Sequence, residues 1–284
     1  MNDPQRNDPR PEDRWWERAA AYRKANEDLD FLALPELRPV RLQLELLKPE
    51  LALANHRIRS TIVVFGSTRL VEPAEAERRL KAAEKEVAAH SEDQRLRIHL
   101  EAARRLLAKS RFYDEARAFG RLVSEGGRHN DQYEYVIITG GGPGIMEGAN
   151  RGAHDIGAES IGLNITLEHE QQPNAYITPD LCFQFHYFAI RKMHFMMRAK
   201  GLVAFPGGYG TLDELFEALT LVQVQKIKPL PIILMGREFW SGIIHFDQMV
   251  AEGVIDPDDL GLFRYAETAA EAWGYIRDFH ARPK

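Results

Sequence analysis

The sequence of 284 residues has a single cysteine, Cys182, which excludes an internal disulfide and indicates a reducing compartment. No run approaches the roughly 20 apolar residues that a membrane-spanning helix needs. The polar, proline-rich stretch from Met1 to Trp16 has no apolar segment of the signal-peptide type. We therefore expect a cytoplasmic protein without a membrane partner. Cys182 lies in the apolar run LCFQFHYF, and we expect it to be packed in the core.

The sequence also has no excess of positive over negative charge, since its formal net charge is -5. A broad electrostatic footprint for a nucleic acid polymer is therefore not expected, although this balance leaves room for a small basic pocket. The sequence lacks a GxxxxGK[ST] loop and a strict G-x-G-x-x-G fingerprint, which disfavours nucleoside triphosphatases and dehydrogenases. His169, His186 and His194 show no metal-ligand spacing, and we predict neither a metal nor a cofactor.

The N-terminal part, residues 1–58, is predicted to form a disordered lead and a helical extension. Apolar residues recur at helical spacing from Arg14 to Leu34 and again from Val40 to His56, with prolines between the two stretches. Trp15 and Trp16 are expected to be buried anchors of this extension, and a contact with another subunit is the alternative.

A second helical segment interrupts the rest of the chain at about residues 71–110. From Pro73 to Lys109 the sequence is highly charged, rich in Ala, Glu, Arg and Leu, and free of glycine. Ser91, Glu92 and Asp93 suggest a turn with a new N-cap, which predicts two antiparallel helices. We expect a charged surface hairpin, with a partner-binding arm as the alternative.

The remaining sequence alternates between short apolar runs and helical patterns. Alternation of this kind predicts a doubly wound parallel sheet with helices on both faces, over residues 59–284. The expected strands are Thr61–Phe65, Tyr135–Thr139, Ser160–Leu163, Leu181–Phe185, Leu202–Phe205 and Pro231–Leu234.

Glycine-rich loops follow three of the predicted strands, at Gly66-Ser67, Gly140–Gly144 and Gly207–Thr211. Ligands of open α/β sheets bind outside the carboxyl ends of the strands. Glycines let backbone amides approach a ligand, and a helix that starts after the loop offers free N–H groups and a partial positive charge to a phosphate. Thr211 is predicted to be the N-cap of such a helix or a hydroxyl donor to the phosphate.

Three charged residues near the last of these loops are candidates for chemistry. Arg191 and Lys192 are adjacent in a predicted helix, where they offer a bidentate fork and a point charge to an anion. Glu214 lies in the first turn of the helix after Thr211. Two plainer explanations stay open: surface charge for the basic pair, and a capping box between Thr211 and Glu214.

These motifs together resemble the LOG family, whose members are cytokinin riboside 5′-monophosphate phosphoribohydrolases that were long described as lysine decarboxylases. PGGYGTLDE, at Pro206–Glu214, resembles the family signature PGGxGTxxE. GGGPGIMEGANRGA, at Gly140–Ala153, and FGS, at Phe65–Ser67, resemble its two other glycine loops, and Arg191-Lys192 matches its Arg-Lys pair. The resemblance covers about residues 60–279 apart from the helical insertion.

The resemblance implies a Rossmann-like fold, commonly a homodimer, with a higher homo-oligomer as the alternative. It also implies hydrolysis of the N-glycosidic bond of AMP or cytokinin ribotides, which releases the base and ribose 5-phosphate. Arg191 and Glu214 match the family's catalytic pair. The substrate-binding residues implied by the motifs are Gly66, Ser67, Gly141, Gly142, Gly144, Glu147, Lys192, Gly207, Gly208, Gly210 and Thr211.

In the hypothetical mechanism, the carboxylate of Glu214 stabilises the positive charge that develops on the ribose, binds ribose hydroxyls or orients the attacking water. Arg191 fixes the substrate, with assistance to the leaving base as the alternative. The alternative is a non-catalytic protein that binds or carries a nucleotide or a molybdenum cofactor, like the carrier proteins to which the sequence is similar. A lysine decarboxylase is disfavoured, because nothing in the sequence selects a lysine for a Schiff base with a cofactor.

Overall fold

A computed structural model describes residues 14–129, 132–166 and 172–281. The predicted disordered lead and His169 lie outside these ranges. The described chain divides into two compact units, the first ending at Leu47 and the second beginning at Lys48. The predicted domain boundary at residue 58 stays a prediction.

The first unit contains short helical pieces instead of the continuous helix predicted from Arg14 to Leu34. Trp15–Arg18 and Ala20–Tyr22 are 3₁₀ turns without a buried residue. A new helix, α1 (Leu29–Ala33), begins where the Asp28 side chain accepts the N–H of Phe31 at 3.2 Å. The prediction of one helix was wrong, because short helices are marginal unless they bury an apolar face. Trp15 is 72% exposed, so it is not the buried anchor that was expected.

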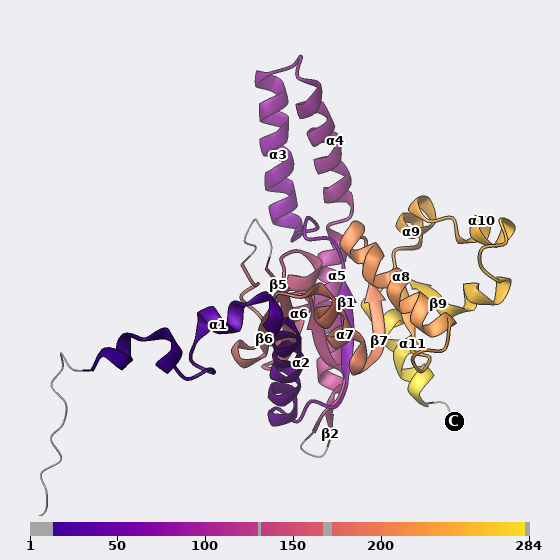
Figure 1. Cartoon of the computed structure of the whole chain (residues 1–284). Helices are drawn as coiled ribbons and strands as arrows, with labels where there is room; N and C mark the ends of the chain where they lie inside the picture. The colour runs from indigo at the N-terminus through magenta and orange to yellow at the C-terminus, as the bar shows by residue number, and fades with distance from the viewer. Residues whose placement is uncertain (1–13, 130–131, 167–171, 282–284) are drawn as a thin grey trace, which may run out of the picture. The chain divides into compact units, whose positions relative to one another are not determined.

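Helix α2 (Arg38–Asn55) runs from the first unit into the second, where a seven-stranded sheet forms the centre. The strand order is β6-β5-β4-β1-β7-β8-β9, and every neighbouring pair is parallel. This arrangement, visible in Figure 1, confirms the predicted doubly wound sheet. The strands are β1 (Thr61–Phe65), β4 (Val136–Thr139), β5 (Ser160–Ile165), β6 (Cys182–Phe185), β7 (Ala199–Ala204), β8 (Ile232–Met235) and β9 (Phe263–Ala266).

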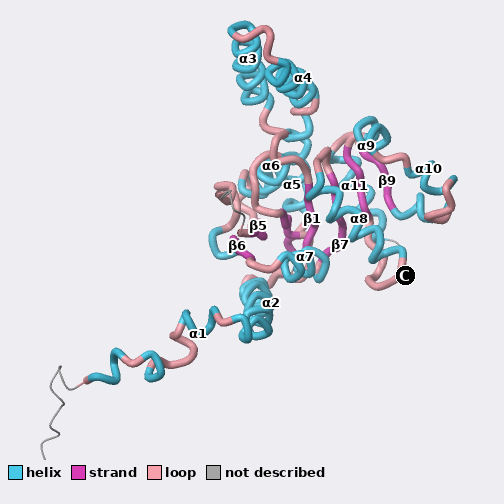
Figure 2. Tube along the Cα trace, turned by 45° about the horizontal axis from the view of Figure 1, so that its top comes forward, coloured by secondary structure: helices cyan, strands magenta, loops and turns pink. Residues whose placement is uncertain are grey.

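Alternate residues of the central strand serve two hydrophobic cores, one on each face of the sheet. Val63 and Phe65 of β1 join one core, and Ile62 and Val64 join the other. The first core is covered by α7 (Phe188–Met197), α8 (Tyr209–Gln223), α9 (Arg237–Ile243) and α10 (Phe246–Ala251). The second is covered by α5 (Arg111–Gly126), α6 (Ile145–His154) and α11 (Ala269–Ala281), as Figures 1 and 2 show.

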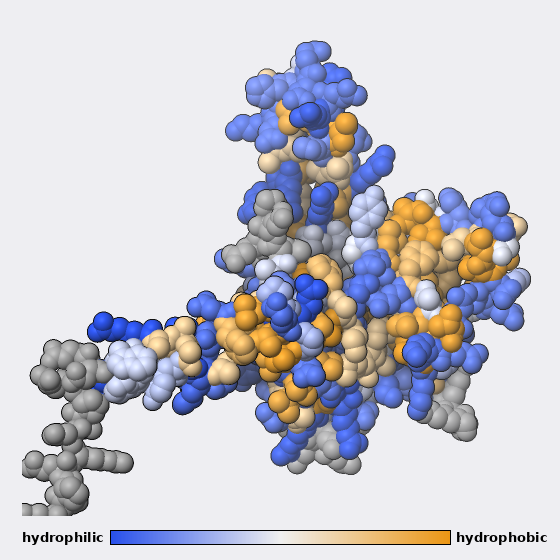
Figure 3. All heavy atoms as spheres, in the orientation of Figure 1, coloured by the Kyte–Doolittle hydropathy of each residue, from blue (hydrophilic) through white to orange (hydrophobic). Residues whose placement is uncertain are grey.

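The helical insertion forms the predicted antiparallel pair, α3 (Pro73–Ala89) and α4 (Gln94–Ala108). Asp93 is the N-cap of α4, and its carboxylate accepts the N–H groups of Arg95 at 2.8 Å and Leu96 at 3.4 Å. The surface of this hairpin is largely hydrophilic in Figure 3, as expected for a solvated pair of helices.

Three further features were not anticipated. Strand β9 escaped prediction because its residues FRYA form no apolar run and only Ala266 is buried. A small antiparallel pair, β2 (Arg128–His129) and β3 (Gln132–Tyr133), lies outside the main sheet. Cys182 is only partly buried instead of packed in the core, because it occupies the edge strand β6. No helix in the described ranges is long and apolar enough to cross a membrane.

Candidate functional site

The strand order brings the three glycine loops to one place. The chain runs from β1 outward through β4, β5 and β6, and then returns to the other side of β1 with β7. The direction of strand addition therefore reverses at β1, and the loops after β4, β1 and β7 emerge from three adjacent parallel strands. A reversal of this kind is where open α/β sheets bind ligands.

The first glycine loop is wedged between the two others. The N–H of Ser67 donates to the carbonyl oxygen of Pro206 at 3.0 Å, and the carbonyl oxygen of Ser67 accepts from the N–H of Ile145 at 3.1 Å. A Cβ on Gly66 would lie 2.5 Å from the side chain of Ile145. Gly144 has φ +71°, and a Cβ there would lie 2.4 Å from the carbonyl oxygen of Ser67. These two glycines are thus required by loop packing as well as by any ligand.

A cavity of about 640 Å³ opens above the first and third loops. Eight of the residues predicted from the sequence line it: Gly66, Ser67, Arg191, Gly207, Gly208, Gly210, Thr211 and Glu214. The other five do not: Gly141, Gly142, Gly144, Glu147 and Lys192.

Helix α8 begins earlier than predicted, at Tyr209, with Gly208 as its N-cap. Thr211 is therefore not the N-cap, and the capping box expected between Thr211 and Glu214 does not form. The extended backbone of Gly208 starts the helix, and its carbonyl oxygen accepts the N–H groups of Thr211 and Leu212, both at 3.0 Å. The first turn of this 15-residue helix lines the cavity, where its N–H groups suit an anion.

Arg191 is a largely buried arginine with a fixed orientation. Its Nε donates to the carbonyl oxygen of Leu163 at 2.8 Å, and its guanidinium lies 5.2 Å from the centre of the Phe195 ring. A Cβ on Gly140 would lie 2.6 Å from Nη2, so the second glycine loop forms part of the wall behind this arginine. Burial lowers the pKa of Arg191, and the nearby Glu214 carboxylate opposes that effect.

Glu214 is 8% exposed, and its side chain makes no hydrogen bond or ion pair with any other residue of the described ranges. Burial raises the pKa of its carboxyl to about 7, although the positive charges of Lys192 and Arg191 act to lower it. Near neutral pH, Glu214 is therefore present in both protonation states. A buried carboxyl with such a pKa beside a cavity is typical of a catalytic group.

Lys192 and Glu147 are engaged elsewhere. The ammonium of Lys192 pairs with Asp213 at 3.0 Å and with Glu217 at 2.8 Å, which ties α7 to α8. The carboxylate of Glu147 accepts a 2.8 Å hydrogen bond from the hydroxyl of Tyr113 on α5. The motifs do not reveal either contact, because each depends on which side chains of neighbouring helices lie close together in the fold.

The second glycine loop is held by a polar network that sequence reasoning missed. Gly141 has φ +77°, and its N–H donates to Thr139 Oγ1 at 3.0 Å. Asn174 Nδ2 donates to the carbonyl oxygens of Gly141 and Gly142 at 3.2 and 3.1 Å, and to Asn150 Oδ1 at 3.1 Å. Asn174 belongs to none of the motifs, so no sequence signal marks it.

The other residues of the cavity wall that were missed include Arg69, Leu106 and Lys109. Arg69 follows the first glycine loop, and the other two come from the end of the helical insertion. The sequence predicts a surface hairpin that could reshape the mouth of the pocket, but its charged composition does not indicate which of its residues meet the cavity.

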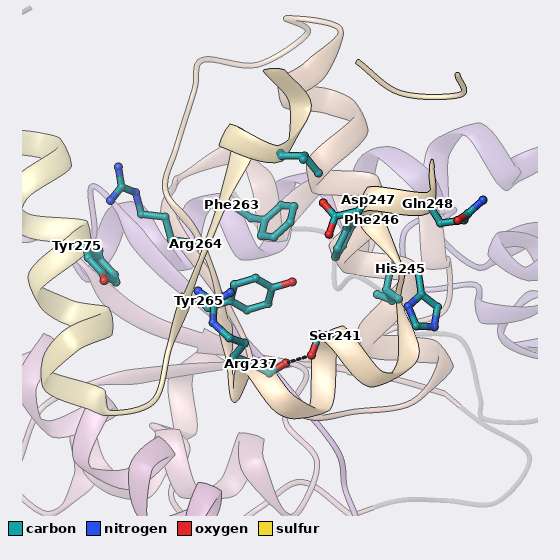
Figure 4. A pocket seen from close by; sticks show the side chains of 12 residues that line it. Arg237, Ser241, His245, Phe246, Asp247, Gln248, Phe263, Arg264, Tyr265 and Tyr275 are labelled. Atoms are coloured by element: carbon teal, nitrogen blue, oxygen red, sulfur yellow. Dashed lines mark hydrogen bonds between the residues drawn. The ribbon is translucent and has the colours of Figure 1, made fainter. Parts of the chain in front are cut away.

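A larger cavity of about 890 Å³ lies around the edge strand β9 (Figure 4). Phe263 and Tyr265 point to one side of the strand, and Arg264 points to the other, toward Tyr275. None of the glycine loops lines this cavity. The smaller cavity is the candidate functional site, because among the cavities of the described residues it is the one where glycine loops meet a buried carboxyl with a shifted pKa. Within the described ranges, no cluster of three or more His, Cys, Asp or Glu side chains is arranged to hold a metal ion.

The part of the chain that contains Arg191 and Glu214 is similar to known proteins. A family described as "Possible lysine decarboxylase" matches residues 146–276, a little under half of the chain, and this range contains both Arg191 and Glu214. "Cytokinin riboside 5'-monophosphate phosphoribohydrolase LOG3" of Arabidopsis thaliana is 29% identical over 140 residues, which cover 48% of this chain and 63% of that protein. The resemblance to the LOG family is confirmed.

Other LOG-family proteins match to similar extents. "Probable cytokinin riboside 5'-monophosphate phosphoribohydrolase LOGL3" of Oryza sativa subsp. japonica is 26% identical over 155 residues, 51% of this chain and 68% of that protein. LOG1 of Arabidopsis thaliana, also named as this phosphoribohydrolase, is 33% identical over 94 residues, 32% of this chain and 44% of that protein. The match to LOG-family relatives thus spans about half of this chain or less.

Two solved structures are also similar. The X-ray structure of a protein named TM1055 is 19% identical with a TM-score of 0.48, and the match covers 77% of this chain and 99% of that one. The molybdenum cofactor binding protein of Rippkaea orientalis is 19% identical with a TM-score of 0.43, covering 60% of this chain and 88% of that one. Because both TM-scores lie below 0.5, these likenesses carry no argument about function.

Proposed function

We propose that this protein is a nucleoside 5′-monophosphate phosphoribohydrolase that hydrolyses the N-glycosidic bond of AMP or of cytokinin ribotides. The observation that carries the proposal is the meeting of Arg191 and Glu214 in one cavity with the first turn of α8. The names of the LOG-family relatives support the same reaction class.

The 5′-phosphate binds at the start of α8. The N–H groups of its first turn are not all used within the helix, and the helix dipole places about half a positive charge there. Gly208 and Gly210 leave this end uncrowded, since a Cβ on either would meet nothing within 4 Å. Phosphate binding at this end positions the ribose for the reaction.

The ribose lies beside Glu214, where the carboxylate stabilises the positive charge that develops as the bond to the base breaks. Water adds to C1′ of the ribose, and its proton leaves with the base, so that the products are the free base and ribose 5-phosphate. Arg191 holds the substrate in place, since its guanidinium is already fixed by Leu163. Its charge also favours the ionised form of Glu214.

We also propose that the protein works as a homodimer in the cytoplasm. Two exposed apolar side chains on one face of α7 support the dimer: Met193 and Met197, one helical turn apart, are each 48% exposed. Neighbouring apolar side chains exposed on one face are typical of a surface that a partner covers.

The test is turnover of AMP, GMP, CMP, UMP and isopentenyladenosine monophosphate by the purified protein, with base and ribose 5-phosphate separated by chromatography. Release of base by the unaltered protein should fall strongly, roughly 10²-fold or more, in Glu214→Ala. Glu84→Ala, at an exposed site on α3, is the matched control and should keep full turnover. Saturable nucleotide binding without any turnover would instead favour the nucleotide carrier.

A further inference from the structure

Two of the cations that line the functional cavity have no acidic partner. Arg69 and Lys109 both line it, and neither forms an ion pair with another residue of the described ranges. The third cation, Arg191, lies near the buried carboxyl of Glu214. The carboxylates on the wall are Asp213, which Lys192 engages at 3.0 Å, and Glu214, which is only partly ionised near pH 7. The cavity therefore carries a surplus of positive charge.

The backbone of Arg69 and Lys109 is held in place by the main body of the protein, and the ammonium of Lys109 donates to the carbonyl oxygen of Arg105 at 3.4 Å. The backbone N–H of Arg69 donates to Ser67 Oγ at 3.1 Å, which fixes the turn that follows the first glycine loop. Lys109 is the C-cap of α4, directly before Ser110, which is buried and donates to the carbonyl oxygen of Leu107 at 2.8 Å. Phe112, three residues after Lys109, is 4% exposed in the core under the sheet. The position of Lys109 therefore does not depend on the outer end of the hairpin.

A phosphate monoester needs more positive charge than α8 supplies. It carries a charge of about -1.5 to -2 at pH 7, whereas the start of a helix offers about +0.5. Lys192, which the sequence motifs suggest for this task, does not line the cavity and already pairs with Asp213 and Glu217.

We propose that Lys109 and Arg69 supply the positive charge that binds the substrate phosphate. The helical insertion is then part of the binding site through Lys109 and selects nucleoside monophosphates over nucleosides. The identity of the substrate in this inference rests on the proposed function, but the location of the anion-binding residues does not.

The experiment measures binding of AMP, ribose 5-phosphate and adenosine by calorimetry, using Glu214→Ala as the background so that turnover does not interfere. Lys109→Met and Arg69→Met, each added to this background, should weaken AMP and ribose 5-phosphate binding about tenfold or more, because each removes a charge-assisted contact. Adenosine binding should be unchanged. Methionine keeps the apolar stem of each side chain, which limits the effect on packing.

Lys85→Met, at an exposed site on α3 of the same insertion, is the matched control and should bind like the background protein. The proposal is overturned if Lys192→Met weakens AMP binding while Lys109→Met and Arg69→Met do not. It is also overturned if the latter two variants weaken adenosine and AMP equally, since that would mean a general distortion of the cavity.

These outcomes are separate from those of the activity test. If the unaltered protein hydrolyses no nucleotide but AMP binding still depends on Lys109, the anion site stands and the reaction fails. If hydrolysis occurs but AMP binding is unchanged in Lys109→Met and Arg69→Met, the proposed reaction is supported and the proposed anion site is refuted. Absence of any AMP or ribose 5-phosphate binding at millimolar concentration would overturn both.

Discussion

Arg191 is fixed to the sheet through Leu163, because its Nε donates a 2.8 Å hydrogen bond to the carbonyl oxygen at the middle of β5. The guanidinium also lies near the Phe195 ring, and the glycine at position 140 gives it room. This arginine is therefore held in one orientation before any ligand arrives, and the ordering of its side chain is not left to the substrate.

We expect Arg191→Lys to lose most of the activity although it keeps the charge. Lysine has no planar fork and cannot hold the hydrogen bond to Leu163 while also reaching a substrate. The value of kcat should fall roughly 10²-fold, as when a preorganised polar group is removed from other active sites. Steady-state kinetics with AMP would measure it, and a lysine variant with the original kcat would refute the role of orientation.

The rate should rise with pH through about 7, the pKa of Glu214. The proposed mechanism needs the ionised carboxylate, so protonation below that pH removes the charge that stabilises the ribose cation. The measurement is kcat at saturating AMP between about pH 5.5 and pH 9. Because AMP is saturating, the ionisation of its phosphate near pH 6 does not change the rate through weaker binding. A rate that falls over the same interval would instead indicate that the protonated carboxyl acts as a general acid.

Glu214 should also make the folded protein less stable as the pH rises. Its folded pKa of about 7 lies above the ordinary value of 4.5, so folding opposes its ionisation. The contribution to the free energy of unfolding is therefore fully present below about pH 4.5 and is lost as the pH rises through 7.

The isosteric variant Glu214→Gln removes this penalty. It should be more stable than the original protein at pH 8, by roughly 1 to 3 kcal/mol, and no more stable near pH 4.5. Urea denaturation at the two pH values gives the comparison. An equal difference at both would mean that ionisation of Glu214 is not its cause.

Gly144 in the second glycine loop and Gly157 in the turn after α6 offer a matched pair of substitutions at positive φ. Gly144 and Gly157 have φ +71° and +68°, but a Cβ on Gly144 would lie 2.4 Å from the Ser67 carbonyl oxygen, whereas one on Gly157 would meet nothing within 4 Å. Gly157→Ala should cost only the backbone strain, about 1 to 2 kcal/mol. Gly144→Ala should cost more and also lower activity, because it displaces the first glycine loop. Equal losses of stability and full activity in both variants would contradict this account.

Local patterns were enough to predict most of the strands and the hairpin. The buried run at Thr61–Phe65 is a strand with the predicted bounds, and Asp93 caps the second insertion helix as expected. The errors arose where tertiary contacts decide. Strand β9 is stabilised by pairing with β8 more than by its own composition, and α8 starts at Tyr209 because Gly208 adopts the N-cap conformation.

The sequence by itself determined that glycine loops follow three strands and that an arginine and a glutamate lie near the last of them, because these are properties of neighbouring residues. Only the tertiary structure decided which of the candidates share a cavity. The strand order brings the glycine loops together. Lys192 pairs with Asp213 and Glu217 and does not line the cavity, whereas Lys109, from the helical insertion, does line it. The pKa of Glu214 is likewise set by burial. Each of these depends on contacts between residues far apart in the chain, which no local pattern encodes.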